Sequence, residues 1–125
     1  MTPGSGHCPV WSSLIIGAGA AVCSYYFCTY KARFMPIYVD DTLDVFGCHG
    51  VSGIWGVIAT GLFASDEVNP SNKGIDHNGA FFGNPTLLGK QIVGILACSS
   101  WSFSITYLIA IIINGTIKLQ LDDYK

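Results

Sequence analysis

The chain has 125 residues, of which half are apolar and 11% are charged, and its mean hydropathy is +0.47. A soluble domain ordinarily carries about 25% charged residues, so this composition indicates a membrane protein. The formal charge of -2 and the lack of a basic cluster in the sequence argue against nucleic acid as a partner.

Three runs without Asp, Glu, Lys or Arg follow one another along the chain, at 8–30, 45–65 and 91–117. A membrane-spanning helix needs about 20 predominantly apolar residues, and each run is long enough. The third run would be about 40 Å long as a straight helix against a hydrocarbon core of about 30 Å, so we expect it to tilt or to extend past the interface. The pattern predicts an all-α integral membrane protein with three transmembrane helices.

Basic residues near the ends of the spans predict how the chain is oriented. Four of them follow the first and third spans, whereas two lie between the second and third spans: Lys31, Arg33, Lys118 and Lys125 against Lys73 and Lys90. Lys and Arg collect on the cytoplasmic side of a membrane. We therefore expect the N-terminus outside, the 66–90 loop outside and the C-terminus in the cytoplasm. The expected location is the plasma membrane.

The five cysteines do not form an obvious disulfide pattern. Their number is odd, no C-x-x-C pair occurs and most lie inside the apolar runs, at Cys8, Cys23, Cys28, Cys48 and Cys98. Cysteine in such a setting behaves as a small apolar side chain, and this is how we interpret these residues.

The second run is rich in glycine, which lets helix backbones approach closely in a membrane. We expect Gly50, Gly53 and Gly56 to be helix-packing positions, with Ser52 and Gly56 forming a small-x-x-x-small pair. Such a helix is packed among other helices rather than surrounded by lipid.

His49 is the one ionisable acid or base between Asp44 and Asp66. An ionisable side chain inside a membrane span is costly, so it is by default a functional-site hypothesis. On a helix His49 shares a face with Val45, Phe46 and Gly53. Desolvation favours the neutral imidazole, whose one donor and one acceptor can pass on a proton or a hydrogen bond. The alternative is that His49 only bonds to a neighbouring helix and holds it in place.

Two acids lie just before the second span. We expect Asp41 and Asp44 to cap the N-terminus of that helix and to interact favourably with its dipole. The sequence has no serine–histidine–acid set, no H-E-x-x-H metal motif and no glycine-rich phosphate loop, so we expect no enzyme, no metal site and no cofactor.

The stretch DDTLDVFGCHGVSGIWGVIATGLFAS resembles the tenth transmembrane helix of the ammonium transporter family (Amt/Mep/Rh). TPGSGHCPVWSSLIIGAGAAV resembles the start of the ninth helix, and FFGNPTLLGKQIVGILACSSWSFSITYLI resembles the loop and the eleventh helix. The resemblance covers nearly all of residues 1–125, most specifically residues 39–65.

The resemblance implies a trimer of eleven-helix subunits, each with its own pore for ammonium or ammonia between two inverted halves. His49 matches the second of two pore histidines, with Val45 and Phe46 beside it along the pore, and Asp41 matches an acid with a structural role. Cys48 stands where the family has an aliphatic residue. The expected partners are ammonium or ammonia and membrane lipid.

The first-half pore histidine, the aromatic gate and the outer cation-binding residues of the family have no counterpart in these 125 residues. The resemblance therefore predicts a three-helix fragment of the eleven-helix fold. Two functions stay open. One is ammonium transport, in which His49 relays a proton or hydrogen-bonds ammonia. The other is a truncated, non-conducting membrane fragment with only a packing or assembly role.

Overall fold

The computed structural model describes residues 2–34, 41, 43–68 and 77–117. These residues form helices and turns, and none of them lies in a strand. Residues Met1–Val93 form one compact unit and Gly94–Lys125 a second. Three lysines on which the orientation prediction rests, Lys73, Lys118 and Lys125, lie outside the described residues.

Three main helical stretches follow the order of the predicted spans. They are α1 (Ser12–Phe34), a π-helical segment η2 (Phe46–Val51) that continues into α2 (Ser52–Phe63), and α3 (Pro85–Thr116). Short 3-10 turns lie at Thr2–Gly4 (η1) and Ala80–Phe82 (η5). The stretches Ser12–Lys31, Phe46–Phe63 and Pro85–Thr116 are long and apolar enough to cross a membrane, which confirms the predicted all-α membrane class.

The bounds of the first helix differ from the predicted 8–30. Residues before Ser12 form turns, and the helix then runs on to Phe34. The helix continues past the charge-free run, and Lys31 and Arg33 lie in its last turn. Cations there interact favourably with the carbonyl end of the helix dipole, so the charged residues extend the helix and do not end it.

The third helix begins six residues before the predicted 91–117. Asn84 accepts a hydrogen bond at its Oδ1 from the backbone N–H of Thr86 (3.1 Å), as an N-cap residue does. Pro85 then occupies the first helical position, where its missing N–H costs nothing. The resulting helix of 32 residues is about 48 Å long, so it exceeds the hydrocarbon core of a bilayer by more than the sequence predicted.

Helix α2 ends at Phe63, two residues before the predicted end of the second span. Ala64 leaves the helical region with a ψ of 140°, and its N–H still bonds to the carbonyl of Thr60. The chain beyond is fixed by backbone contacts: Ser65 N–H donates to the carbonyl of His7 (2.8 Å), and Gly79 N–H donates to that of Ala64 (2.8 Å). The N-terminal turn and the loop before α3 are thus tied to this end of α2.

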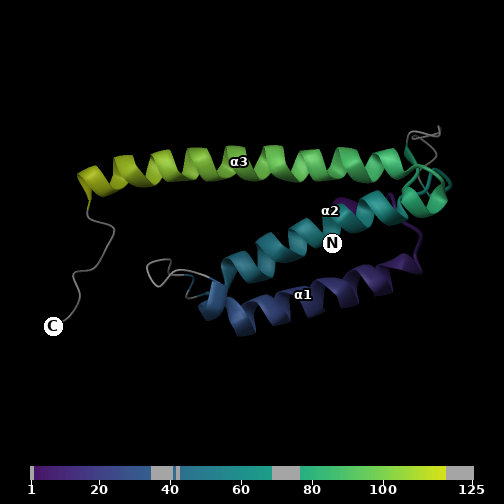
Figure 1. The fold of residues 1–125 in the computed structure, drawn as a ribbon, viewed down its shortest axis with the longest axis horizontal. Helices are drawn as coiled ribbons and strands as arrows, with labels where there is room; N and C mark the ends of the chain where they lie inside the picture. Colours follow the sequence, from purple (N-terminus) through teal and green to yellow (C-terminus); the bar gives the residue numbers. More distant parts are fainter. Residues whose placement is uncertain (1, 35–40, 42, 69–76, 118–125) are drawn as a thin grey trace. The chain divides into compact units, whose positions relative to one another are not determined.

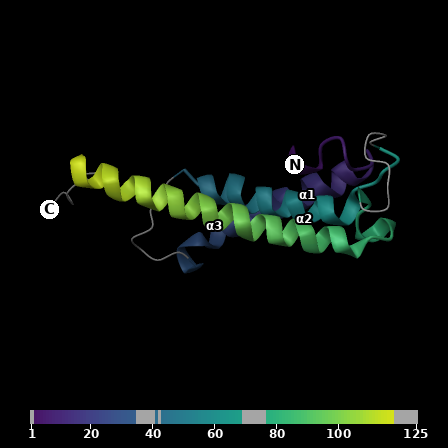
Figure 2. The same cartoon turned by 90° about the horizontal axis from the view of Figure 1, so that it is seen from above.

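Helices α1 and α2 run antiparallel and side by side (Figures 1 and 2). The indole of Trp55 lies against Gly19 of α1, and its Nε1 donates a hydrogen bond to the carbonyl oxygen of Ile16 (2.9 Å). Ile16, Ala59 and Phe63 form the buried cluster beside it. Since lipid is as apolar as a leucine side chain, close packing and hydrogen bonds of this kind hold helices together in a bilayer.

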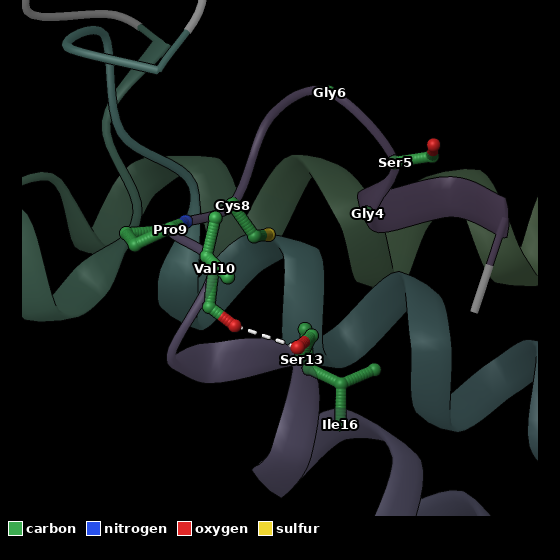
Figure 3. Close-up of a pocket in the computed structure, with 8 residues that line it drawn as sticks. All are labelled: Gly4, Ser5, Gly6, Cys8, Pro9, Val10, Ser13 and Ile16. Carbon is green, nitrogen blue, oxygen red and sulfur yellow. Dashed lines mark hydrogen bonds between the residues drawn. The ribbon is translucent and has the colours of Figure 1, made fainter.

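An open pocket of about 330 Å³ lies at the N-terminal turn (Figure 3). Its lining includes Gly4, Cys8 and Ile16, and the Ser13 hydroxyl on its wall donates to the carbonyl of Val10 (2.6 Å). No charged side chain lines it. Among the described residues, the pocket therefore offers small apolar groups, serine hydroxyls and the Cys8 thiol.

Candidate functional site

The second span begins at a pair of aspartates. The carbonyl of Asp44 accepts the first helical hydrogen bond, from the N–H of Cys48 (2.8 Å), and Asp41 Oδ1 accepts one from the N–H of Val45 (2.9 Å). The Asp41 carboxylate thus binds a backbone donor that the helix itself leaves unpaired. A negative charge at this end is also favoured by the helix dipole.

The Asp44 side chain contacts the preceding helix. Its Oδ1 lies 2.7 Å from Nζ of Lys31, and the same ammonium group donates to the backbone carbonyl of Asp41. Asp44 has a φ of +54°, the left-handed conformation that aspartate tolerates better than most residues. Lys31 therefore joins the end of α1 to the residues that start the second span.

The π-helical segment η2 contains His49. In an α-helix the N–H of Ser52 would bond to the carbonyl of Cys48, but here it bonds to the carbonyl of His49, and the Ser52 hydroxyl donates to Cys48 instead. The N–H bond joins residues three apart, which is 3-10 spacing at the end of the π-helical segment, and the hydroxyl gives the Cys48 carbonyl a side-chain donor. Segments of this type are often found at functional sites.

The three predicted pore residues, Val45, Phe46 and His49, lie within the first turns of this span and are all exposed. Within the described parts of the chain, no side chain forms a hydrogen bond with the His49 imidazole. The Phe46 ring packs on Phe27 of α1, with 5.3 Å between ring centroids. Of the three, Phe46 therefore contributes to contact between α1 and the second span.

The π spacing changes which residues share the face of His49. The sequence argument used the three-and-four spacing of an α-helix to place Gly53 beside His49. A π turn brings residues five apart into register, so that spacing does not hold through Phe46–Val51. Sequence reasoning missed this because nothing in the local composition distinguishes a π turn from an α turn.

The glycines of the second span have different surroundings. A Cβ on Gly50 would meet the ring of Phe46 in the same segment at 2.9 Å, and Gly56 is buried. A Cβ on Gly53 would meet no described atom within 4 Å. The packing role predicted for Gly53 therefore has no contact partner among the described residues and stays a prediction about helices beyond α1.

Two close contacts between a glycine and a side chain of the other helical stretch were not predicted from the sequence. A Cβ on Gly19 would collide with the Trp55 indole, and one on Gly47 would collide with the Cys28 sulfur. Gly19 lies in a run of small residues in α1, and this run was the sequence signal that another helix could approach closely. What it could not reveal is which residue of another helix would lie against it.

The arrangement offers one imidazole on an apolar helical segment whose start is held by an ion pair and a carboxylate cap. A neutral imidazole supplies one donor and one acceptor to a permeating molecule or to a neighbouring helix. Among the described residues, no group of three or more His, Cys, Asp or Glu side chains could hold a metal ion. Hydrogen bonding or proton transfer by His49 thus stays a prediction for this site.

These features define an all-helical integral membrane protein whose second span carries a histidine on a π-helical segment. A sequence model described as the Ammonium Transporter Family matches residues 1–125, and the chain belongs to that family.

Individual relatives agree with this assignment. The chain is 43% identical over 121 residues to an ammonium transporter of Bacillus subtilis, covering 96% of this chain and 28% of that protein. It is 35% identical over 123 residues to ammonium transporter 1 of Dictyostelium discoideum, covering 98% of this chain and 25% of that protein. The crystal structure of Mep2 from Candida albicans superposes with a TM-score of 0.80 at 31% identity, covering 94% of this chain and 26% of Mep2.

The chain spans about a quarter of the length of these relatives. Its three spans therefore correspond to part of a larger helical fold. The relatives are named as ammonium transporters, and the matching family is one of transporters.

Proposed function

We propose that this chain contributes one wall of an ammonia pathway across the membrane, in which His49 lines the pore with Val45 and Phe46. The observation that carries the proposal is the position of His49: exposed on an apolar π-helical segment, with no hydrogen-bond partner among the described residues. A permeating ammonia molecule can be that partner, since it can both accept and donate a hydrogen bond.

The apolar surroundings give a reason for selectivity. A hydrated metal cation cannot shed its water into an apolar passage that lacks a ring of carbonyl oxygens. Ammonium, in contrast, can leave its proton behind and cross as ammonia, and the imidazole can relay that proton or hydrogen-bond the neutral molecule. Asp41, Asp44 and Lys31 have a positioning role in this proposal, because they hold the start of the segment.

A second candidate is a membrane protein that only packs with other helices and conducts nothing. No residue of α3 is fully buried among the described residues, although Leu88 and Gln91 lie close to Gly61 of α2, so most of its surface is available to lipid or to further helices. Three spans with a single candidate pore histidine also do not enclose a pore. In this alternative His49 serves as a hydrogen-bonding contact between helices.

The remaining parts of the proposal concern the assembly. We propose the plasma membrane as the location, with the N-terminus outside and the C-terminus in the cytoplasm. A homotrimer in which each subunit has its own pore is the assembly expected of the family, with ammonium or ammonia as the substrate and lipid around it.

The test is a chimera in which this chain replaces the matching part of the Bacillus subtilis ammonium transporter, to which it is 43% identical over 121 residues. Uptake of labelled methylammonium into cells that lack other ammonium transporters measures its activity. We expect the chimera to transport and its His49→Ala variant to lose most uptake. The matched control is His77→Ala, which removes an exposed histidine outside the candidate spans and should leave uptake unchanged.

The two candidate functions predict different results. A chimera that reaches the membrane and transports equally well with alanine at His49 would eliminate the pore role of that residue. A chimera that assembles with normal yield but never transports would favour the packing role. The 125-residue chain alone, purified into liposomes, is expected to take up no methylammonium, because it cannot enclose the pathway by itself.

A further inference from the structure

Three tyrosines lie together on the surface of α1, near its C-terminal end. Their side chains are between 49% and 66% exposed: Tyr25, Tyr26 and Tyr30. The rings of Tyr26 and Tyr30 stack with 6.2 Å between their centroids, and the Tyr25 ring meets the Tyr26 ring edge to face at 5.7 Å. The three rings therefore form one continuous aromatic surface.

These tyrosines belong to a longer exposed stripe along α1. Residues three and four apart share a face of a helix. The positions that follow this spacing are all exposed: Ile15, Ala18, Val22, Tyr26, Tyr30 and Arg33. We call these six residues, with Tyr25 beside Tyr26, the tyrosine stripe. Ile16 and Ala20, in contrast, are buried, so the stripe lies away from the packed side of α1.

Arg33 gives the tyrosine stripe a positive charge at one end. Lys31 is bound to Asp44 (2.7 Å), in the one ion pair that the described residues form. Arg33 lies two residues further along, about 200° round the helix at about 100° per residue. It is exposed and forms no hydrogen bond or ion pair with another described residue. Its planar guanidinium, with five N–H donors, is therefore available to a phosphate group, whose geometry it matches.

The dimensions of the stripe fit a lipid of one leaflet. The helix rises about 15 Å from Ile15 to Tyr25, at about 1.5 Å per residue, which is half of a hydrocarbon core of about 30 Å. The apolar positions up to Val22 thus have the length that acyl chains cover. Tyrosines are enriched where the hydrocarbon meets the headgroups, and a long arginine side chain can extend from there to the headgroup level.

The residue types of the stripe favour lipid over another helix. Helix–helix contacts in membranes use small residues that let backbones approach, as Gly19 does against Trp55. The tyrosine stripe instead presents bulky rings and a cation at the end of an apolar surface. These are the side chains of a membrane interface, and the cation selects for a negatively charged headgroup.

We propose that the tyrosine stripe is a binding surface for an anionic phospholipid such as phosphatidylglycerol. Arg33 binds the phosphate, the tyrosine hydroxyls donate to headgroup oxygens, and the acyl chains lie along Ile15, Ala18 and Val22. A zwitterionic lipid such as phosphatidylcholine binds less well, because its choline cation is repelled by Arg33. The proposal rests on the exposed side of α1 and does not depend on transport.

The test is photo-cross-linking in phosphatidylcholine vesicles that contain the 125-residue chain. One sample includes a small fraction of phosphatidylglycerol with a diazirine on an acyl chain, and the other includes the same fraction of phosphatidylcholine with the same diazirine. Mass spectrometry of digested protein gives the ratio of labelling by the two lipids on the α1 peptide that carries the stripe. We expect a ratio of about five, since one arginine near a membrane surface strengthens the binding of anionic lipid by about this factor.

Two results of this measurement would overturn the proposal. Equal labelling of the α1 peptide by the two lipids would show that lipid contacts the stripe without selection of its headgroup. An α1 peptide that neither lipid labels, in samples where α3 is labelled, would show that protein covers the stripe.

Three variants make the result specific to the cation. Arg33→Gln should reduce the labelling ratio to about one, and Arg33→Lys, which keeps the charge, should retain most of it. The matched control is Lys90→Gln, which removes an exposed cation from α3 and should leave the ratio unchanged. An unchanged ratio in Arg33→Gln, or an equal decrease in Lys90→Gln, would contradict the assigned role of Arg33. Circular dichroism of the same samples excludes misfolding as the cause of a lower ratio.

Discussion

Gly19 and Trp55 show what a single residue decides in this fold. The indole occupies the space that a side chain at Gly19 would need, and its Nε1 bonds to a carbonyl of the same helix, that of Ile16 (2.9 Å). Because lipid competes equally well for apolar surface, the helix pair gains little from burial alone. The small residue and the hydrogen bond are therefore the features that favour this helix pair over lipid contact.

We expect Gly19→Ala to destabilise the protein, because the new methyl group overlaps a bulky ring that cannot rotate away freely. Overpacking of this kind costs about 1–3 kcal/mol. Thermal unfolding in detergent, followed by circular dichroism, measures the loss. The control is Gly89→Ala in α3, where a Cβ meets no described atom within 4 Å; it should be neutral or slightly stabilising, since alanine is the better helix former. Equal losses in the two variants would contradict the packing argument.

At the scale of elements, the ends of the helices are set by side chains that the search for charge-free runs ignored. Lys31 and Arg33 fall inside α1, and Asn84 with Pro85 starts α3 well before the apolar run. A search for caps and not only for apolar length would have found the second of these. The π-helical form of η2 has no comparable sequence signal.

We expect Asn84→Ala to shorten or fray the start of α3, because the N–H of Thr86 loses its side-chain acceptor. Loss of an N-cap costs about 0.5–2 kcal/mol. Amide hydrogen exchange over the first turn of α3 should rise, while exchange in α2 should be unchanged. Asn84→Ser, which keeps a capping oxygen, should restore most of the protection, and a failure of serine to do so would mean that Asn84 acts through its other contacts.

For the molecule as a whole, charge predicts an orientation in the membrane. Lys31 and Arg33 lie in the last turn of α1, and the positive-inside rule predicts that this end is cytoplasmic. The same prediction puts the turn after α2, with exposed Glu67 and Val68, on the outside. Most of the large apolar side chains of α3 are exposed, as a span that contacts lipid or further helices requires.

The orientation is testable by labelling from one side. In a chain with its native cysteines replaced by serine, Arg33→Cys and Glu67→Cys each place one thiol at an exposed position near opposite ends of the helix pair. A membrane-impermeant maleimide added to intact cells should label Glu67→Cys at once. It should label Arg33→Cys only after the membrane is permeabilised, and the reverse pattern would invert the proposed topology.

The sequence by itself determined the membrane class and the three apolar stretches long enough to span a membrane. It also identified His49 as the candidate functional residue within them. Apolar length and a lone ionisable residue are local properties that need no knowledge of neighbours. It also predicted that the acids before the second span lie at a helix start.

Only the tertiary structure decided which residues touch. The Lys31–Asp44 ion pair, the Gly19–Trp55 contact and the Phe27–Phe46 ring contact each join residues far apart in sequence. Such contacts depend on the rotation and register of two helices, and η2 changes that rotation by its π spacing. Composition and α-helical periodicity do not indicate the π turn. The sequence could therefore identify His49 as a candidate residue without showing which contacts hold its helical segment in place.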